Sequence, residues 1–312
     1  MKKLPLDNTG YQYLLKAFEE WLDILGYATG TVYNLPVYNR EFLYFLETQN
    51  IQQLQAITHG QIKDYHQYLL SRTNEREGGA LSSNYINGHL FALEKFFEFL
   101  RHRGIRNLPE INVRRLEIEK FKREILTIEE IKELYKIIDE QECITPKQEA
   151  LNYQDRVLLA IYYGCGLRNN EGRSLCLEDI NLDTQILHVK KGKGNKQRLI
   201  PFNNAVKECL KIWIYEYRMI LLKEKTEPHL FISSYGRPMA GCTLRNRLKR
   251  LITQSSNIKI KEKNITLHSL RHSIATHLLA GGMDIQKVQK FLGHSCLDTT
   301  EIYTHLIEET EK

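Results

Sequence analysis

Residues 265–305 contain the side chains of this chain that are best suited to chemistry. His268 and Arg271 lie three residues apart, and His294 and Tyr303 follow them. Positions i and i+3 share one face of a helix, so the first two side chains can reach one target. A guanidinium fork, two imidazoles and a phenol can together bind a phosphate, stabilise its added charge and attack it.

A second group of polar side chains lies upstream of this segment. Arg168 follows Gly164 and Gly166, which permit a tight turn after an apolar helix. Glu171 comes three residues later, where it can orient the guanidinium. The planar fork of an arginine suits a phosphate because it donates two parallel hydrogen bonds. An ordinary salt bridge at a helix start is the alternative interpretation.

Residues 190–198 form a basic run with five cationic side chains. The run joins two predicted strands, so its lysines lie at the tip of a hairpin. A lysine on such a hairpin can enter a DNA minor groove and donate a proton, and Lys191, Lys193 and Lys196 are all present there. A solvated basic turn is the alternative. The pattern G-x-x-x-x-G-K-[ST] is absent, which excludes a nucleotide-binding P-loop.

The bulk composition is that of an ordinary globular protein of the cytoplasm. A length of 312 residues predicts two domains, and 42% hydrophobic with 26% charged residues is typical of soluble chains. No run of about 18 apolar residues indicates a membrane span, and no apolar stretch near Met1 indicates a secretory signal. The six cysteines are scattered without a C-x-x-C pair. We therefore expect reduced thiols, no metal and no membrane partner.

The net charge of +6 is distributed unevenly along the chain. Residues 1–110 are almost neutral, whereas the remainder carries the excess of Lys and Arg. Basic charge concentrated in one part of a chain indicates a polyanionic partner. Residues 107–123 combine Pro109, poor periodicity and a basic cluster, which predicts a linker. This linker is either a solvated connector or a strap that touches backbone phosphates.

The first third of the chain predicts helices, because its apolar residues recur at helical spacing. Thr29 or Thr31, Thr58, and Ser82 or Ser83 are the candidate N-caps. Phenylalanines in the last of these helices form a stripe that predicts core packing rather than a base-stacking surface. The predicted helices span residues 11–25, 29–47, 58–72 and 82–100.

The rest of the chain predicts helices around one small β-hairpin. Thr127 and Glu130 form a capping box that opens a helix. Further on, the apolar period shifts towards two, which predicts strands at 186–190 and 197–200. The chain after residue 203 is again helical in pattern.

Two helices are expected in the segment that holds the candidate chemistry. The helix at 268–279 has an apolar stripe to which neither His268 nor Arg271 belongs. These two side chains lie near the helix N-terminus, where anions are favoured. Asp284 is expected to cap a short following helix, and Gly293 is expected to end it.

In their order, these motifs resemble those of the tyrosine recombinase (phage-integrase-like) family. The family pattern is an Arg, a hairpin Lys, His-x-x-Arg, a His or Trp, and a Tyr. The matching segments are Gly-Leu-Arg168, Lys193 in Gly-Lys-Gly-Asn-Lys, His268-Ser-Leu-Arg271, Leu-Gly-His294-Ser and Ile-Tyr303-Thr-His. The resemblance covers nearly the whole chain in a two-domain, Xer-like form. It implies a mainly α fold with a small β-sheet.

The resemblance also implies domain boundaries. Residues 1–106 are similar to the helical core-binding (SAM-like) DNA-binding domain of the family, residues 107–123 to its linker, and residues 124–312 to its mixed α/β catalytic domain. In one departure, Gly172 follows Glu171 where relatives usually have an aliphatic residue, which leaves the packing of this helix open. Relatives also often carry a longer tail helix after the tyrosine, so assembly through such a tail stays open.

The activity implied by the resemblance is site-specific DNA recombination, as in an integrase, through a 3′-phosphotyrosyl intermediate and a Holliday junction. Such a reaction conserves the phosphodiester energy and needs no cofactor and no metal. The implied catalytic residues are Arg168, Lys193, His268, Arg271, His294 and Tyr303. Glu171 is implied to orient Arg168.

The implied partner is double-stranded DNA with specific recombination sites, bound in the cytoplasm at the nucleoid by a homotetramer or by a heterotetramer with a paralogue. Two alternative functions stay open. The same active site could nick and reseal DNA like a type IB topoisomerase, or the chain could be a non-catalytic DNA-binding accessory factor. Helices near residues 84–87 and 243–253 are candidates for the major groove. Candidate phosphate contacts are Lys191, Lys196, Arg198, Arg237, Arg245 and Arg247.

Overall fold

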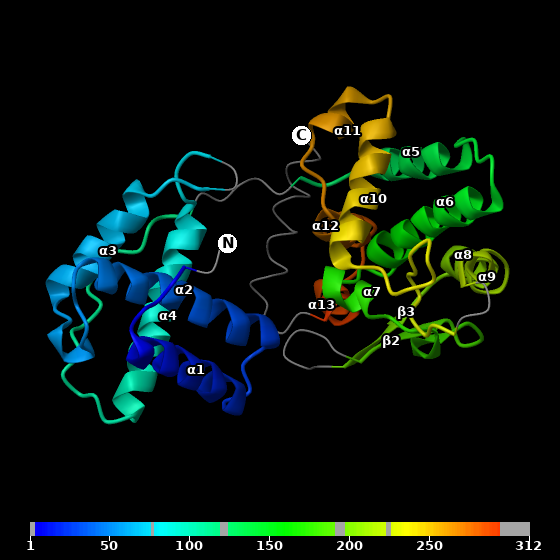
Figure 1. The fold of residues 1–312 in the computed structure, drawn as a ribbon. Coiled ribbons are helices and arrows are strands. Elements are labelled where there is room, and N and C mark those ends of the chain that lie inside the picture. The colour runs from blue at the N-terminus through cyan, green and yellow to red at the C-terminus, as the bar shows by residue number, and fades with distance from the viewer. Residues whose placement is uncertain (1–3, 76–77, 119–123, 191–196, 223–225, 294–312) are drawn as a thin grey trace. The chain divides into compact units, whose positions relative to one another are not determined.

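The computed structural model describes residues 4–75, 78–118, 124–190, 197–222 and 226–293. The chain divides into two compact units, Met1–Phe121 and Lys122–Lys312, and each unit has its own hydrophobic core (Figure 1). The fold is mainly α with one small β-sheet, so the fold class predicted from the sequence is confirmed.

The N-terminal unit is built from helices that begin close to the predicted positions. Thr58 and Ser82 are N-caps, as predicted, and the Thr58 cap includes a capping box with Gln61. The second helix instead begins after Ala28, which makes no side-chain cap bond, and it continues through Pro36. The elements are α1 (Thr9–Ile24), α2 (Thr29–Thr48), a 3₁₀ turn at Leu54–Ala56, α3 (His59–Ser71) and α4 (Ser83–His102).

Aromatic rings fill the core of this unit. Phe18 of α1 packs edge-on against Phe96 of α4, and Phe99 lies against both Phe18 and Trp21. Phe96, Phe97 and Phe99 are buried, so these three rings of the predicted stripe on α4 belong to the core, whereas Phe91 is 37% exposed. Large aromatic side chains supply much of the buried area that holds such a small helical unit together.

The segment after α4 stays attached to the N-terminal unit as far as Leu116. Its apolar side chains at Leu108, Ile111 and Leu116 pack against the aromatic core. The side-chain amide of Asn87 in α4 forms two hydrogen bonds with the backbone of Leu116, at 2.8 and 2.9 Å. Arg115 also pairs with Glu94 of α4 at 2.6 Å. The described part of the predicted linker therefore packs these apolar side chains against the helical unit, while polar side chains such as Arg114 and Glu117 are exposed.

The C-terminal unit combines helices with one small sheet, which lies at an edge of the unit (Figure 1). Thr127 caps α5 with the predicted capping box, and Thr145 caps α6 in the same way. The elements before the sheet are α5 (Ile128–Asp139), α6 (Pro146–Leu159), a π-helical turn at Ala160–Gly164, α7 (Asn169–Arg173) and a 3₁₀ turn at Leu177–Asp179. The elements after it are α8 (Asn204–Ile212), a π-helical turn at Trp213–Tyr217, α9 (Arg218–Leu222), α10 (Gly241–Gln254), α11 (Ile258–Glu262), α12 (Leu267–Ala280) and α13 (Ile285–Leu292).

The sheet is an antiparallel meander in the order β1–β2–β3, with β1 at Ile180–Asn181, β2 at Ile186–Val189 and β3 at Arg198–Pro201. The predicted hairpin is confirmed, and its register pairs Val189 with Arg198 and Leu187 with Ile200. The sequence analysis missed β1, because two residues are too few to show a period. The pairing of Val189 with Arg198 places the start of β3 beside the end of β2, at the base of the basic run.

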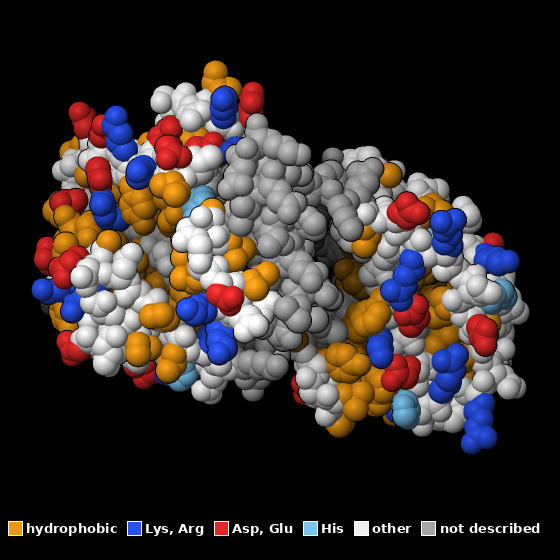
Figure 2. Space-filling model, turned by 180° about the vertical axis from the view of Figure 1, so that it is seen from behind, with side chains coloured by type: hydrophobic (Ala, Val, Ile, Leu, Met, Phe, Trp, Pro, Cys, Tyr) orange, Lys and Arg blue, Asp and Glu red, His pale blue; other side chains and the backbone are white. Residues whose placement is uncertain are grey.

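The surface carries charge of both signs. On the face drawn in Figure 2, Lys and Arg side chains are interspersed with Asp and Glu over both units, among the residues drawn in colour. The basic excess of the C-terminal part therefore does not form a field of one sign on this face. Within the described ranges, no helix is both long enough and apolar enough to cross a bilayer.

Candidate active site

Arg168 is positioned by a glycine turn and by the start of α7. The chain leaves the π-helical turn through Gly166, whose φ is +61°, and a Cβ at this position would come within 2.9 Å of Leu292. Only glycine combines this backbone conformation with such close packing. Arg168 then serves as the N-cap residue of α7. Its Nη1 donates to Glu171 Oε1 at 2.7 Å, and its Nη2 donates to the carbonyl oxygen of Gly293 at 3.1 Å.

Arg271 lies in the second turn of α12, which Thr266 caps. It lies off the apolar stripe, as predicted, yet it is 1% exposed. Its Nη1 donates to the carbonyl oxygen of Gly166 and its Nη2 to that of Leu292, both at 2.6 Å. Burying a cation is costly unless its donors are satisfied, and these carbonyl oxygens satisfy two of them.

The C-terminal end of α13 brings the two arginines together. Arg271 binds the carbonyl of Leu292 and Arg168 binds the carbonyl of Gly293, which is the next residue. The last carbonyls of a helix have no partner within the helix and carry partial negative charge, so they favour cations. Gly293 has a φ of +66° and ends the helix, as predicted. Figure 1 shows α13 against α12 and β3 in this part of the unit.

Glu171 is a buried carboxylate shared by two arginines. Arg168 donates to it from its side chain and from its backbone N–H at 2.9 Å. Arg198 of β3 donates from both terminal nitrogens, at 2.9 and 2.8 Å. Burial alone would raise the pKa of Glu171. The hydrogen bonds and charge of Arg198, together with those of Arg168, outweigh this effect and lower the pKa to about 2. Glu171 is therefore an anion near neutral pH.

Gly172 is explained by the ring of Tyr162. A Cβ at position 172 would lie 2.6 Å from Tyr162 Cζ, and Tyr162 is fully buried. The Tyr162 hydroxyl donates to the carbonyl of Asn169 at 3.1 Å, so the ring is fixed against the first turn of α7. The space that an aliphatic side chain takes in relatives is filled here from the preceding helix. This answers the packing question that Gly172 raised in the sequence.

His268 lies at the exposed N-terminal end of α12. Its ring centre is 4.4 Å from that of the buried His272, with the two rings close to perpendicular. The neighbouring ring restricts where the imidazole of His268 can turn, and it leaves one side open to solvent. The remaining predicted catalytic and hairpin residues lie outside the described residues: Lys193, His294, Tyr303, Lys191 and Lys196.

The other candidate DNA contacts fall into two groups. Arg237 and Arg245 are exposed. Arg247 instead donates from Nε to the buried Asp155 at 2.5 Å, and Arg250 binds the second oxygen of the same carboxylate at 2.6 Å. Arg198, which was also predicted as a phosphate contact, has a 10% exposed side chain bound to Glu171. Two of the predicted DNA-contact arginines thus have carboxylate partners inside the protein.

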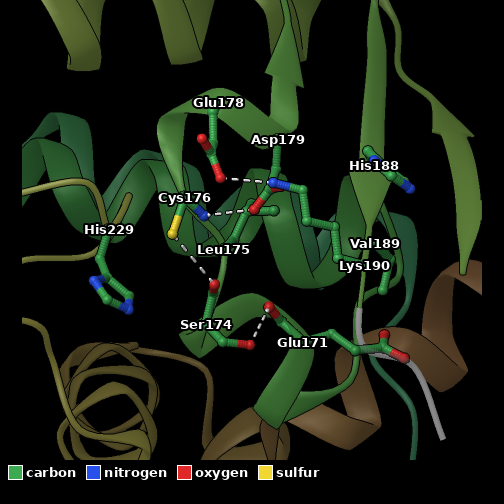
Figure 3. Close-up of a pocket in the computed structure, with 10 residues that line it drawn as sticks. All are labelled: Glu171, Ser174, Leu175, Cys176, Glu178, Asp179, His188, Val189, Lys190 and His229. Carbon is green, nitrogen blue, oxygen red and sulfur yellow. Dashed lines mark hydrogen bonds and ion pairs between the residues drawn. The ribbon is translucent and has the colours of Figure 1, made fainter. Parts of the chain in front are cut away.

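A cavity of about 290 Å³ lies beside the arginine cluster but does not include it. Figure 3 shows Lys190 pointing towards Glu178 and Asp179, and the carboxylate of Glu171 pointing away from them. The Lys190 ammonium is 2.6 Å from Glu178 and 2.8 Å from Asp179. These contacts tie the end of β2 to the turn that precedes the sheet. Arg168, Arg198 and Arg271 do not line this cavity.

Some functional contacts were missed by the sequence analysis. The carbonyl partners of Arg271 come from residues whose side chains carry no signal, so no motif could reveal them. Arg198 did have a signal: it lies two residues before Ile200, which is fully buried, and residues i and i+2 of a strand share a face. Strand alternation therefore places Arg198 on the inner face of β3.

A helical unit followed by a mixed unit with a short antiparallel sheet is the architecture of DNA strand-exchange recombinases. The XerH site-specific recombinase, solved bound to a palindromic difH substrate, superposes with a TM-score of 0.70 over 96% of this chain and 83% of that one, at 22% identity. The Tn1549 transposon integrase, solved with circular intermediate DNA, gives 0.66 over 93% and 94% of the two chains, at 17% identity. These likenesses establish the fold.

Sequence comparison identifies the family. The chain belongs to the phage integrase family, whose model matches residues 124–310. It is 34% identical to the tyrosine recombinase XerC of Bacillus subtilis (strain 168) over 95% of this chain and 92% of the relative. It is 32% identical to the tyrosine recombinase XerD of Staphylococcus saprophyticus over 92% and 93% of the two chains. The resemblance predicted from the motifs is confirmed, and the chain is a site-specific DNA recombinase.

Proposed function

We propose that this recombinase cleaves and rejoins double-stranded DNA through a 3′-phosphotyrosyl intermediate. The Tyr303 hydroxyl oxygen attacks the scissile phosphorus, the bond from phosphorus to the 5′ oxygen breaks, and a 5′-hydroxyl leaves. Lys193 supplies the proton to that leaving oxygen. His268 assists the departure of the phenolic proton. Attack by another strand's 5′-hydroxyl reverses these steps and joins the strands without an external energy source.

Arg168 and Arg271 bind the two non-bridging oxygens in this proposal, and His294 donates a further hydrogen bond to the phosphate. One observation supports the assignment above all others: both guanidinium groups are bound to consecutive carbonyls, at Leu292 and Gly293, directly before His294 in the chain. Donors held in place before the reaction need no reorganisation when charge develops. Each such donor typically contributes about 3 kcal/mol to transition-state stabilisation.

The partner of this chain in the proposal is double-stranded DNA with specific sites. The XerH recombinase was solved on a difH substrate after cleavage, and the Tn1549 integrase was solved with circular intermediate DNA. We extend DNA binding to this chain on the strength of its family. Residues 1–106 act as the core-binding domain and residues 124–312 as the catalytic domain. Arg237 and Arg245 are exposed and suited to backbone phosphates.

Strand exchange between two duplexes requires two cleavages on each, so the proposal includes an assembly of four protomers, identical or shared with a paralogue. The intermediate is a Holliday junction. The reaction takes place in the cytoplasm, where the chromosome lies. A type IB topoisomerase-like enzyme would relax supercoils without forming a junction between two duplexes, so junction formation separates the two activities.

The test is covalent trapping. The purified protein is incubated with fragmented genomic DNA, denatured, and the DNA that remains attached is sequenced. We expect one recurrent site with the protein at a 3′ end. Tyr303→Phe should give no adduct, and Tyr235→Phe, which alters an exposed tyrosine in the same unit, should trap as well as the unaltered protein. An adduct that persists in Tyr303→Phe would overturn the assignment of the nucleophile.

A further inference from the structure

Arg198 occupies an unusual place for a cation next to a basic hairpin. It begins β3, directly after the run of lysines, yet its side chain turns inward and is 10% exposed. Both terminal nitrogens bind the carboxylate of Glu171, one to each oxygen, at 2.9 and 2.8 Å. Parallel bonds of this kind use the full fork of a guanidinium, and a lysine could not reproduce them.

The carboxylate held by Arg198 is the one that orients Arg168. Glu171 Oε1 accepts from Arg168 Nη1 at 2.7 Å, and Oε2 accepts from the Arg168 backbone N–H at 2.9 Å. The direction of the Arg168 fork therefore depends on where Glu171 lies. Arg198 fixes Glu171 from the side of the sheet, while α7 fixes it from the side of the helix. The strand thus acts on Arg168 through the shared carboxylate.

The backbone of Gly293 packs against the side chain of Arg198. A Cβ at position 293 would lie 2.6 Å from Arg198 Cδ and 2.9 Å from its Nε. The side chain of Arg198 therefore packs directly over the backbone of this glycine. The Gly293 carbonyl accepts from Arg168 at 3.1 Å. Strand β3, helix α7 and the end of α13 meet around this one side chain.

Charge explains why a second arginine is useful there. A pair made only of Arg168 and Glu171 would be neutral, and an incoming phosphate would compete with the carboxylate for the same fork. With Arg198 included, two cations share one anion, so the cluster keeps one positive charge. In a partly buried setting that surplus charge attracts an anion much more strongly than it would in bulk water.

We propose that Arg198 is a positioning residue for strand cleavage. It holds Glu171 in place, so that Arg168 stays oriented towards the scissile phosphate and the cluster keeps one positive charge to bind it. This inference rests on the proposed function of Arg168. It also replaces the interpretation of Arg198 as a contact to DNA backbone phosphates, which becomes one outcome of the test.

The test measures single-turnover cleavage of a duplex that carries the site recovered by covalent trapping. One version has an ordinary scissile phosphate, and the other has a methylphosphonate there, which lacks the negative charge that Arg168 neutralises. With the ordinary phosphate, we expect Arg198→Gln to slow cleavage about 100-fold, as for loss of one preorganised donor. Arg198→Lys should recover little, because it lacks the fork. With the methylphosphonate, the loss should shrink to about threefold or less.

Two controls separate positioning from a merely structural role. Arg156→Gln removes another arginine–carboxylate pair of the same unit, with Asp139, and should cleave like the unaltered protein. In the double variant Arg168→Gln/Arg198→Gln, cleavage should be no slower than in Arg168→Gln alone, because two residues that act through one contact are not additive. This comparison holds even if each variant is somewhat less stable.

Distinct results would overturn the inference. An equal loss on both substrates, or additive losses in the double variant, would show that Arg198 does not act through Arg168. Unchanged cleavage of bound DNA, with weaker binding and a smaller salt dependence, would make Arg198 a phosphate contact. If covalent trapping yields no DNA at all, the proposed cleavage chemistry itself is wrong. This result differs from a failure of the positioning role of Arg198 alone, in which trapping succeeds.

Discussion

Glu171 of the catalytic unit and Glu41 of the helical unit are both buried among polar partners, and the pKa values of these two carboxyls shift in opposite directions. Glu171 in the catalytic unit is 5% exposed, and Glu41 in the helical unit is 1% exposed. The pKa of Glu171 is lowered to about 2, whereas burial raises the pKa of Glu41. Similar burial therefore leads to a fixed anion in one unit and to a carboxyl that resists ionisation in the other.

The partners of the two carboxylates explain the difference. Glu171 receives hydrogen bonds from two guanidinium groups and a backbone N–H. Glu41 has one close guanidinium, with Arg72 Nε at 2.9 Å, and a Tyr68 hydroxyl at 3.4 Å. His89 lies 3.8 Å away, but burial lowers its pKa to about 3, so it is neutral near pH 7.

At these two sites, the carboxyl bound by two guanidinium groups and a backbone N–H has a lowered pKa, and the carboxyl bound by one guanidinium group has a raised pKa. In the helical unit the network around Glu41 joins α2, α3 and α4 and specifies how they pack. In the catalytic unit the network around Glu171 orients the guanidinium of Arg168, which we propose binds the scissile phosphate.

The largest expected effect is a loss of strand cleavage when Glu171, but not Glu41, is replaced by glutamine. Glu171→Gln should reduce strand cleavage about 100-fold, because the amide donates where Arg168 and Arg198 need an acceptor. Glu41→Gln should change cleavage of bound DNA by no more than about threefold, because its network contacts no catalytic residue. Single-turnover cleavage at saturating protein measures both. Equal losses in the two variants would mean that the Glu171 network has no special role in catalysis.

Acid unfolding should show opposite slopes for the two carboxyls. The folded pKa of Glu171 is lower than its ordinary 4.5, so its stabilisation is complete above pH 4.5 and is lost as pH falls towards 2. The full effect is roughly 3 kcal/mol. The folded pKa of Glu41 is higher than 4.5, so its contribution is complete below pH 4.5 and is lost as pH rises through the folded pKa.

The two tryptophans allow each unit to be followed separately in that measurement. Trp21 lies in the helical unit and Trp213 in the catalytic unit, and the chain has no others. Urea unfolding is recorded by fluorescence of Trp21→Phe and Trp213→Phe backgrounds between pH 7 and 3.5. For the catalytic unit, the difference in free energy of unfolding between the unaltered protein and Glu171→Gln should shrink as the pH falls. For the helical unit, the difference between the unaltered protein and Glu41→Gln should grow. Parallel slopes would contradict the comparison.

Much of the frame around both carboxylates could be predicted from the sequence. Helical spacing located α1 to α4, the cap residues of α3, α4 and α5 were predicted, and strand alternation located the hairpin, because these are local signals. The i+3 spacing also predicted that Glu171 would orient Arg168. What local signals could not supply was a contact between distant segments, such as Arg198 with Glu171 or Arg271 with backbone carbonyls.

The buried state of Arg271 illustrates the same limit. Its position off the predicted apolar stripe of α12 gave no sign of burial, but its fork ends on the carbonyls of Gly166 and Leu292. These acceptors exist only because a glycine turn and a helix C-terminus come together in three dimensions. Glu41 was missed for a similar reason, since its partners Arg72 and His89 come from other parts of the unit and show no shared motif.

A smaller effect compares one glycine in each unit. Gly172→Ala should destabilise the catalytic unit by about 2 kcal/mol, because its Cβ would lie 2.6 Å from the buried Tyr162 ring. Gly88→Ala in α4 should be neutral or stabilise the helical unit by up to about 1 kcal/mol. Its Cβ would lie at an ordinary 3.5 Å from Tyr38, and alanine favours a helix.

Urea unfolding in the same tryptophan backgrounds measures both alanine variants. The double variant Gly172→Ala/Tyr162→Leu serves as the control, because a smaller side chain at 162 leaves room for the new methyl group. Its cost should be less than the sum of the two single costs. Strict additivity would show that Tyr162 does not exclude a side chain at position 172.

The smallest effect concerns the segment that leaves the helical unit. Asn87→Ala removes both hydrogen bonds to the Leu116 backbone, and it should destabilise the helical unit by about 1 kcal/mol with no change in the catalytic unit. Asn84→Ala is the matched control, because Asn84 lies one turn earlier on α4 and is exposed. Hydrogen exchange at the Leu116 amide should rise in the first variant only. If Asn84→Ala weakened DNA binding while Asn87→Ala did not, α4 would use one asparagine for DNA and the other to fasten the chain between the units.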